Sequence, residues 1–353
     1  MYHRHHSDSP PQSAPNLLPP VIQPKGFEFL FNTWSGRLII INLVMFILEI
    51  KFSPGSSINE IPYQTLIRLG AKDSVLLAAG EYWRLVTPMF LHGNLLHLIF
   101  NNWALFAVAF QLEALLGARV FLLLYFLAGI GGNILSAAWT VNLSVGASGS
   151  LFGLLGCAWF FERTIHKRFT ETTGYKPKAG AYTVMVVANI LFGFMIPQID
   201  NAAHMGGLIV GIATAYVVLH ATPNRLVSLH KTRARIVGGA AVLVFTAVGV
   251  IASSPYYVKW RLQRAADTAE QADRRYFLVG RLLDLDSKDR IVLWQHFRLA
   301  LVLNDFTSAD SDFKLLSGDP DFPPKVKNLA ADLWSYNPRA AEWLDSRLVD
   351  PGE

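Results

Sequence analysis

The sequence predicts an all-α, multi-pass membrane protein, and three observations support this fold class. Hydrophobic residues make up 52% of the 353 residues and charged residues 16%, whereas about a quarter of the residues in a soluble domain are charged. The apolar residues form about seven long stretches, and a helix needs ~20 such residues to cross a bilayer. The basic residues are concentrated in alternate connections between these stretches, as the positive-inside rule describes.

The first element is residues 1–27, which are rich in Pro, Ser and His and are expected to be a disordered cytoplasmic tail. This tail lacks the apolar core and small-residue cleavage site of a signal peptide. A polar segment over 53–88 separates the first two apolar stretches, and the fourth stretch is short, so its flanks are expected to complete it. Membrane-spanning helices are expected over 37–52, 89–116, 120–139, 148–161, 181–196, 202–219 and 236–252.

The charges of the connections predict the orientation. With the N-terminus in the cytoplasm, the connections 117–119, 162–180 and 220–235 lie inside, and all three carry Lys or Arg. The exterior connections 140–147 and 197–201 carry neither, so every short loop obeys the positive-inside rule. An odd number of helices then places the C-terminus outside. The absence of an organelle-targeting segment favours a bacterial plasma membrane.

The composition changes after the last apolar stretch. Residues 254–353 mix charges of both signs with aromatic residues, and the segments 260–283 and 292–303 have helical apolar spacing. We therefore expect four parts: the tail 1–27, a six-helix core over 28–220, a basic loop and seventh helix over 221–253, and a small soluble helical domain over 254–353, outside the cytoplasm.

Several classes of partner are disfavoured. The net charge is +5, but no basic face with interleaved aromatic residues indicates nucleic-acid binding. The single cysteine, Cys157, lies in an apolar stretch, which excludes disulfides within the chain and cysteine-based metal clusters. No cofactor or metal is expected, and nothing in the sequence indicates an oligomeric state. The protein is expected to lie in a lipid bilayer.

Polar residues inside spanning helices are costly and therefore indicate function. In the predicted topology the second, fourth and sixth helices all run from outside to inside, and each carries such residues near its outer end. These residues are His92, His97 and Asn101 on the second helix, Ser148 on the fourth and His204 on the sixth. The three helices thus bring one set of polar groups to a similar depth, just below the outer surface.

Ser148 lies between Gly146 and Gly149 where a loop meets a helix. Flanking glycines allow a tight turn, and the free N–H groups of a helix N-terminus favour an anion, such as a tetrahedral oxyanion, beside the serine. Taken alone, this pattern also fits a plain N-cap serine with small neighbours.

His204 favours a catalytic interpretation. Gly207 and Gly211 follow it with a spacing of four, and Gly149 and Gly153 have the same spacing on the fourth helix. Small residues four apart let membrane helices approach closely, which a Ser–His pair needs, because its atoms must come within ~2.6–3.2 Å. A lone histidine in a membrane helix would otherwise indicate a structural hydrogen bond or a pore lining.

His97 and Asn101 are four residues apart and share one helix face. Both could donate hydrogen bonds to an oxyanion, or they could link helices as buried polar contacts. His92, near the membrane boundary, is interpreted as structural. Asp200 is one turn before His204, but it lies in an exterior connection and is expected to be solvated rather than to orient the histidine.

Four motifs, in order, resemble those of rhomboid intramembrane serine proteases over residues 37–219. They are Glu81-Tyr82-Trp83-Arg84 in the first exterior loop, the segment 92–101 of the second helix, Gly146-Ala147-Ser148-Gly149 and Ala203-His204-Met205-Gly206-Gly207. The resemblance implies six core helices around a water-filled cavity open to the outside, and cleavage of transmembrane segments of substrate proteins at small residues in helix-destabilised stretches.

The resemblance also implies roles for individual residues. Ser148 would be the nucleophile and His204 the general base and acid. His97, Asn101 and the Ser148 N–H would form an oxyanion hole, and Phe152 would stack on the histidine. The remaining motif residues would be supporting: Glu81, Trp83 and Arg84 in the exterior loop, with His92, Gly146, Gly149, Gly207 and Gly211 around the dyad.

Other functions fit the sequence less well. An intramembrane metalloprotease needs a His-Glu-x-x-His pair, and an aspartyl protease needs two aspartates in spanning helices; the sequence has neither. A channel or transporter should carry polar groups through the whole membrane depth. The main alternative is a non-catalytic rhomboid relative that binds transmembrane clients, although such relatives usually lack the serine or the histidine.

Overall fold

The computed structural model describes residues 28–53, 58–173, 180–196, 198–221 and 231–348. The expected tail 1–27 and part of the basic loop, 222–230, lie outside these residues. Within the described ranges the regular secondary structure is helical apart from one isolated bridge between Lys72 and Ser144. The all-α prediction is therefore confirmed.

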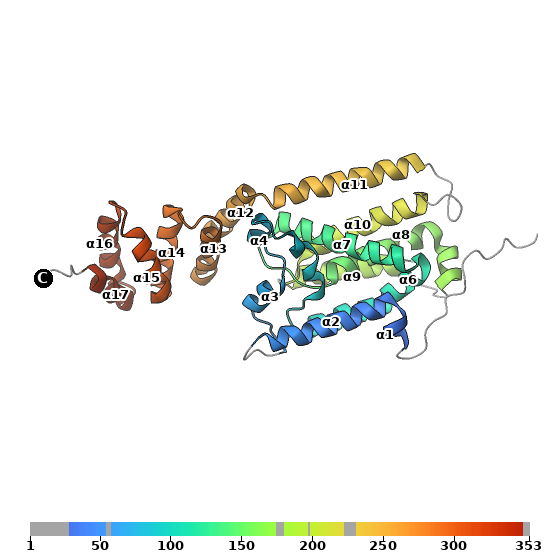
Figure 1. Cartoon of the computed structure of the whole chain (residues 1–353), viewed down its shortest axis with the longest axis horizontal. Helices are drawn as coiled ribbons and strands as arrows, with labels where there is room; N and C mark the ends of the chain where they lie inside the picture. The colour runs from blue at the N-terminus through green and yellow to red at the C-terminus, as the bar shows by residue number, and fades with distance from the viewer. Residues whose placement is uncertain (1–27, 54–57, 174–179, 197, 222–230, 349–353) are drawn as a thin grey trace, which may run out of the picture.

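Each of the predicted spanning stretches contains a helix (Figure 1). The second predicted spanning helix consists of α5, a π-helical turn η3 and α6, and it begins at Leu95 rather than at residue 89. The predicted start was wrong because Pro88 lies in a separate 3-10 helix, η2 (Thr87–Phe90), and because the Asn94 side chain caps α5 by accepting from the His97 N–H. The helices are α2 (Trp34–Lys51), α5 (Leu95–Ala104), η3 (Leu105–Ala109), α6 (Phe110–Leu116), α7 (Ala118–Trp139), α8 (Ser148–Thr173), α9 (Ala181–Met195), α10 (Asn201–Ala221) and α11 (Lys231–Ala252).

Three helices of the described chain are long and apolar enough to cross a membrane by themselves: Leu95–Leu116, Ala118–Trp139 and Asn201–Val218. A fourth results if Gly238–Ala252 and Pro255–Asp267 count as one span, although the two are bent by 64°. Of the other predicted spans, α2 includes the charged Arg37, Glu49 and Lys51, and α9 has 15 residues.

The second spanning helix is joined to α2 at one end. The short helix α1 (Glu28–Asn32) precedes α2, and Thr33 caps α2. The Glu113 carboxylate of α6 accepts from the Trp34 and Ser35 N–H groups, at 2.7 and 2.8 Å. A carboxylate is favourable at a helix N-terminus, where N–H groups lack intrahelical partners. This contact fixes α6 beside the start of α2, at the end of the bundle away from Ser148.

The centre of the bundle is the packing of α8 and α10 against each other and against α7. At Gly207 a Cβ atom would come within 1.9 Å of the Gly149 carbonyl oxygen, and at Gly211 within 2.0 Å of the Gly153 carbonyl oxygen. Only glycine leaves room for backbones at this separation. The regular spacing of four therefore produces a continuous contact between the two helices.

The polar segment between the first two spanning helices folds into short helices that the sequence analysis did not predict. They are α3 (Tyr63–Leu69), α4 (Ser74–Ala78), η1 (Tyr82–Leu85) and η2. They lie at the end of the bundle where α7 ends and α8 begins, and the Lys72–Ser144 bridge joins them to the α7–α8 loop.

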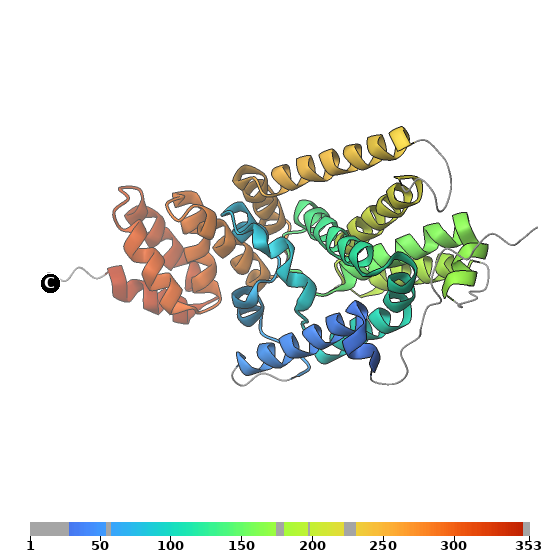
Figure 2. The same cartoon turned by 45° about the vertical axis from the view of Figure 1, so that its right-hand side comes forward.

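The C-terminal part is a row of antiparallel helices (Figure 2). The predicted single segment 260–283 is two helices, since the chain turns at 268–271; Arg275 stabilises this turn by donating to the carbonyls of Ala266 and Ala269. A separate apolar core surrounds Phe297, Phe322 and Leu344. The helices are α12 (Pro255–Asp267), α13 (Ala272–Leu285), α14 (Arg290–Val302), α15 (Phe306–Leu316), α16 (Phe322–Leu333) and α17 (Pro338–Leu348).

Replacing Gly211 by alanine should destabilise the bundle, because the new Cβ would overlap the Gly153 carbonyl. Overpacking of this kind costs ~1–3 kcal/mol, so we expect a clear fall in the Tm of the detergent-solubilised protein. The matched control is Gly239→Ala in α11, where a Cβ meets nothing within 4 Å. Equal melting temperatures for the two variants would show that the α8–α10 contact is not tight.

Candidate active site

The segment before α8 presents Ser148 at a helix N-terminus. Gly146 has φ +120° and donates its N–H to the Pro88 carbonyl, at 2.8 Å. Ser148 is the first residue of α8, in the turn whose N–H groups have no intrahelical partner. Two features require a glycine at this position. This φ disfavours other residues, and a Cβ at 146 would lie 2.6 Å from the His97 ring.

His204, in the first turns of α10, contacts the serine. The distance between His204 Nε2 and Ser148 Oγ is 2.8 Å, within hydrogen-bonding range. The Phe152 ring, one turn along α8 from Ser148, stacks on the imidazole with centroids 4.0 Å apart and planes 14° apart. His204 Nδ1 is buried without a hydrogen-bond partner among the described atoms, so the structure places a Ser–His pair rather than a triad.

His97 and Asn101, on one face of α5, flank the nucleophile segment. A Cβ built at Gly146 would meet the His97 ring first and the Asn101 Nδ2 atom next, at 3.3 Å. Asn101 is buried, and its Nδ2 donor has no partner among the described atoms. A buried N–H donor without a partner is costly, and here it lies close to Gly146, two residues before Ser148.

His92 is fully buried behind this face. Its backbone N–H donates to the Glu49 Oε1 atom at 2.9 Å. Its ring packs edge-on against the His97 ring, with the ring centroids 5.2 Å apart. Glu49 of α2 is also fully buried and was not predicted as part of the site. Its sequence signal was a carboxylate within an apolar stretch, which is costly unless it has a structural or functional partner.

Asp200 was expected to be solvated, and that expectation was wrong. It is half-buried, accepts from the Ala203 N–H at 3.0 Å and bonds to the Ser136 hydroxyl of α7. Burial raises the pKa of this carboxyl, but the nearby Lys72 charge and these hydrogen bonds outweigh it and hold the pKa below its usual value. The available signal was its place directly before a helix, where aspartate is a favoured cap.

Lys72 lies in the exterior segment and is fully buried. Burial lowers the pKa of its ammonium to about 8, although Asp200 and Asp73 partly counteract this effect. The ammonium donates to the Asn142 carbonyl at 2.7 Å. Lys72 thus joins the exterior segment to the α7–α8 loop that leads to Ser148.

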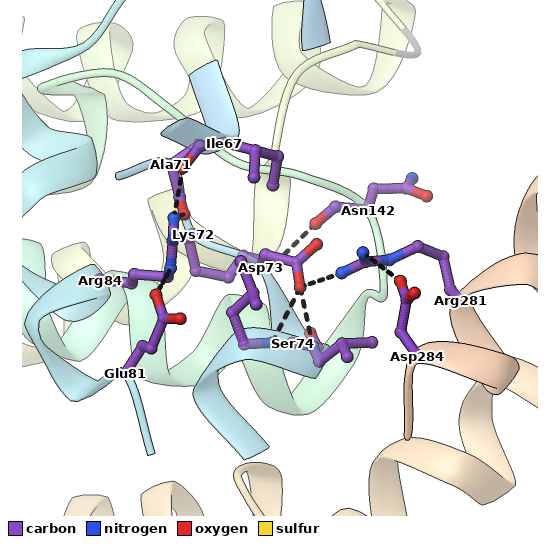
Figure 3. Close-up of polar contacts among 12 residues, drawn as sticks. Ile67, Ala71, Lys72, Asp73, Ser74, Glu81, Arg84, Asn142, Arg281 and Asp284 are labelled. Carbon is purple, nitrogen blue, oxygen red and sulfur yellow. Dashed lines mark hydrogen bonds and ion pairs between the residues drawn. The ribbon is translucent and has the colours of Figure 1, made fainter. Parts of the chain in front are cut away.

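Glu81, Trp83 and Arg84 hold the exterior segment together, and Figure 3 shows the contacts of Arg84 with Glu81, Ile67 and Ala71. Arg84 is buried, pairs with Glu81 at 2.7 Å and lies over the Trp83 ring at 4.3 Å. Its guanidinium also donates to the carbonyls of Ile67 and Ala71. One side chain therefore ties η1 to the end of α3 and to the residue next to Lys72, which fixes the shape of the exterior segment.

Comparison with known proteins gives the family of this bundle. Residues 79–221, which include Glu81, Arg84, His97, Ser148 and His204, match the model of the rhomboid domain. This part of the chain is a rhomboid domain. The resemblance inferred from the sequence motifs is therefore confirmed.

Relatives of this rhomboid protein come from bacteria, plants and a parasite. It is 41% identical to Rhomboid protease GluP of Bacillus subtilis over 183 residues, 52% of this chain and 34% of GluP. It is 37% identical to RHOMBOID-like protein 5 of Arabidopsis thaliana over 161 residues, 44% of this chain and 50% of that protein. It is 29% identical to Rhomboid-like protease 3 of Toxoplasma gondii over 188 residues, 51% of this chain and 68% of the relative.

The rhomboid chain thus spans between a third and a half of the length of the first two of these relatives. The family includes proteins named as proteases, and the apolar helices of this member make it an integral, multi-pass membrane protein. Among the described residues, no group of three or more His, Cys, Asp or Glu side chains is placed to hold a metal ion.

Replacing Asp200 by alanine should destabilise the protein, because α10 loses its cap and the Ser136 hydroxyl loses its acceptor. Loss of an N-cap costs ~1 kcal/mol, with more for an orphaned buried group. Asp200→Asn keeps one acceptor oxygen for the Ala203 N–H and replaces the other oxygen by an NH2 donor, which the Ser136 hydroxyl can accept, so it should melt between the wild type and Asp200→Ala. Thermal unfolding of the three proteins in one detergent tests this order, and an unchanged Tm for Asp200→Ala would contradict it.

Proposed function

We propose that this rhomboid protein is an intramembrane serine endopeptidase that cleaves transmembrane segments of other membrane proteins. The observation that carries the proposal is the 2.8 Å contact between His204 Nε2 and Ser148 Oγ. The pair lies beside the buried, unpartnered Asn101 donor and the His97 ring. A nucleophile, its base and donors for developing charge are the parts that acyl transfer to a serine requires.

In the proposed reaction, Ser148 Oγ attacks the scissile carbonyl while His204 Nε2 accepts the hydroxyl proton. His97, Asn101 and the Ser148 N–H donate to the resulting oxyanion. Collapse of this intermediate breaks the peptide bond, and His204 returns the proton to the leaving amine. Water then hydrolyses the acyl-enzyme with His204 again acting as base. The stacked Phe152 ring supports the imidazole plane throughout.

The arrangement of the elements supports a site that opens to the exterior. Ser148 and His204 lie at the N-terminal ends of α8 and α10, and the exterior segment with α3 and α4 lies at the same end. Helices α12 and α13 are at this end too. We propose a cytoplasmic N-terminus, an extracytoplasmic helical domain over 254–353 and a bacterial plasma membrane as the location. Determining which terminus a protease can reach in sealed, oriented vesicles tests this orientation.

Ser148→Ala and His204→Ala should each abolish cleavage of a transmembrane reporter by the purified protein. Loss of a member of a catalytic Ser–His pair typically lowers kcat by a factor on the order of 10⁴–10⁶. The matched control is Ser335→Ala, an exposed serine of the helical domain, which should cleave as the wild type does. A fluorophosphonate probe should label the wild type at Ser148.

The outcomes separate the hypotheses. Labelling without cleavage means an active serine and an unsuitable reporter. If neither cleavage nor labelling of the wild type occurs, the protease proposal is wrong, and binding of transmembrane clients without catalysis becomes the better account.

Asn101→Ala should lower kcat by about 10²–10³ with little change in KM, because one oxyanion donor contributes ~2.7–4 kcal/mol to transition-state stabilisation. The Tm should change little, because the Asn101 Nδ2 donor has no partner in the folded protein. A large fall in Tm with an unchanged kcat would instead assign Asn101 to helix–helix contact.

A further inference from the structure

The C-terminal helical domain packs against the exterior segment of the core. Helices α12 and α13 both contact α4. Val75 of α4 is buried in one apolar cluster with residues of these two helices, among them Val258, Leu262 and Val279. In contrast, α14–α17 surround a separate apolar core of their own. The contact with the rhomboid core therefore involves the first helix pair of the domain.

One ion pair joins α13 to this segment (Figure 3). The guanidinium of Arg281 binds the Asp73 carboxylate, and the exposed fractions of the two side chains are 15% and 3%. Asp73 also caps α4, accepting from the Val75 and Leu76 N–H groups at 3.0 Å. A pair so shielded from water is screened little by salt, and removal of one partner leaves the other charge buried.

A ring contact and a shared hydrogen bond extend the same interface. The Tyr63 hydroxyl of α3 donates to Asp73 at 3.2 Å. The Tyr63 ring meets the Phe277 ring of α13 edge-on, with centroids 5.3 Å apart. Helices α3 and α4 are thus both attached to α13 around a single carboxylate.

A second attachment joins α12 to the end of α7. The Tyr257 hydroxyl donates to the Ala138 carbonyl at 2.8 Å, and the Arg261 guanidinium donates to the carbonyls of Ala138 and Trp139. The last carbonyls of a helix lack intrahelical partners and favour a cation. Arg261 therefore fixes the point at which the α7–α8 loop leaves α7.

Both attachments reach the loop that carries the nucleophile. Lys72, next to Asp73, exchanges two backbone hydrogen bonds with Ser144, at 3.0 and 3.1 Å, and its ammonium binds the Asn142 carbonyl. Ser144 is four residues before Ser148 in the sequence. The loop is thus fixed at its start by α12 and at its middle by a segment that α13 holds.

We propose that α12 and α13 position the catalytic serine, with Arg281 and Arg261 as positioning residues that act through the exterior segment and the α7–α8 loop. The proposal rests on the proposed protease function. It assigns to the helical domain a part in the reaction, although the domain lies beyond the residues that match the rhomboid domain. The two arginines touch neither Ser148 nor His204, so their effect is on the placement of Oγ.

The test uses Arg281→Ala in the full-length protein, with Arg281→Lys as the conservative variant. The control is Arg347→Ala, which breaks an exposed ion pair with Asp310 within the same domain. Arg281→Ala should slow fluorophosphonate labelling of Ser148 by roughly tenfold, since charge-assisted hydrogen bonds are the strong ones. For Arg281→Ala we expect kcat for a transmembrane reporter to fall similarly and KM to change less than about twofold. Arg281→Lys should restore part of the loss. Arg347→Ala should react as the wild type does.

Amide hydrogen exchange gives a readout that does not depend on catalysis. The Ser144 N–H donates to Lys72 and the Gly146 N–H to Pro88, and exchange at both should be about tenfold faster in Arg281→Ala than in the control, since local opening sets exchange rates. Unchanged exchange of these amides would overturn the positioning proposal even if the wild type labels. If these amides exchange faster in Arg281→Ala but the probe never labels the wild type, the result supports the coupling and contradicts the protease function.

Discussion

The close approach of α8 and α10 is the constraint on which the rest of the structure depends. The carbonyls of Gly149 and Gly153 occupy the space that side chains at Gly207 and Gly211 would need. Because a serine and a histidine must come within hydrogen-bonding distance from two different helices, the backbones must nearly touch just below them. The contact between Ser148 and His204 is thus a property of the helix pair, and the Phe152 ring stacks on the imidazole.

The exterior connections provide the second constraint. The loop before Ser148 has a shape set by buried charges together with an apolar cluster that includes Ile61, Leu66 and Val145. Arg84, Lys72 and Asp200 each bond to backbone or side-chain groups of a different segment. Buried charged groups of this kind are stable only when they are well paired. These contacts hold the exterior connections to one another.

The sequence predicted the helices well because they have local signals, and the same kind of signal singled out Ser148 and His204, whose side chains are in contact in the structure. Apolar length marks α7 and α10, glycine spacing marks the packing of α8 against α10, and Ser148 and His204 are polar residues in apolar surroundings. It did not predict Asp200, Glu49 or Lys72, because their roles depend on partners distant in sequence, such as Ser136, His92 and Asn142. The break between α12 and α13 was missed for a similar reason, since carbonyl contacts of Arg275 close that turn.

The π-helical turn Leu105–Ala109 divides the second spanning helix into two functional halves. A π turn accommodates one residue more than an α-helical turn, so the residues after it face a direction that regular periodicity from His97 and Asn101 would not give. The outer half carries the polar face beside Ser148, whereas the inner half presents Glu113 to the start of α2. A single extra residue thereby allows each half to keep its own partner. In alignments of related chains, a one-residue gap inside this helix would mark a change of helix phase rather than an error of alignment.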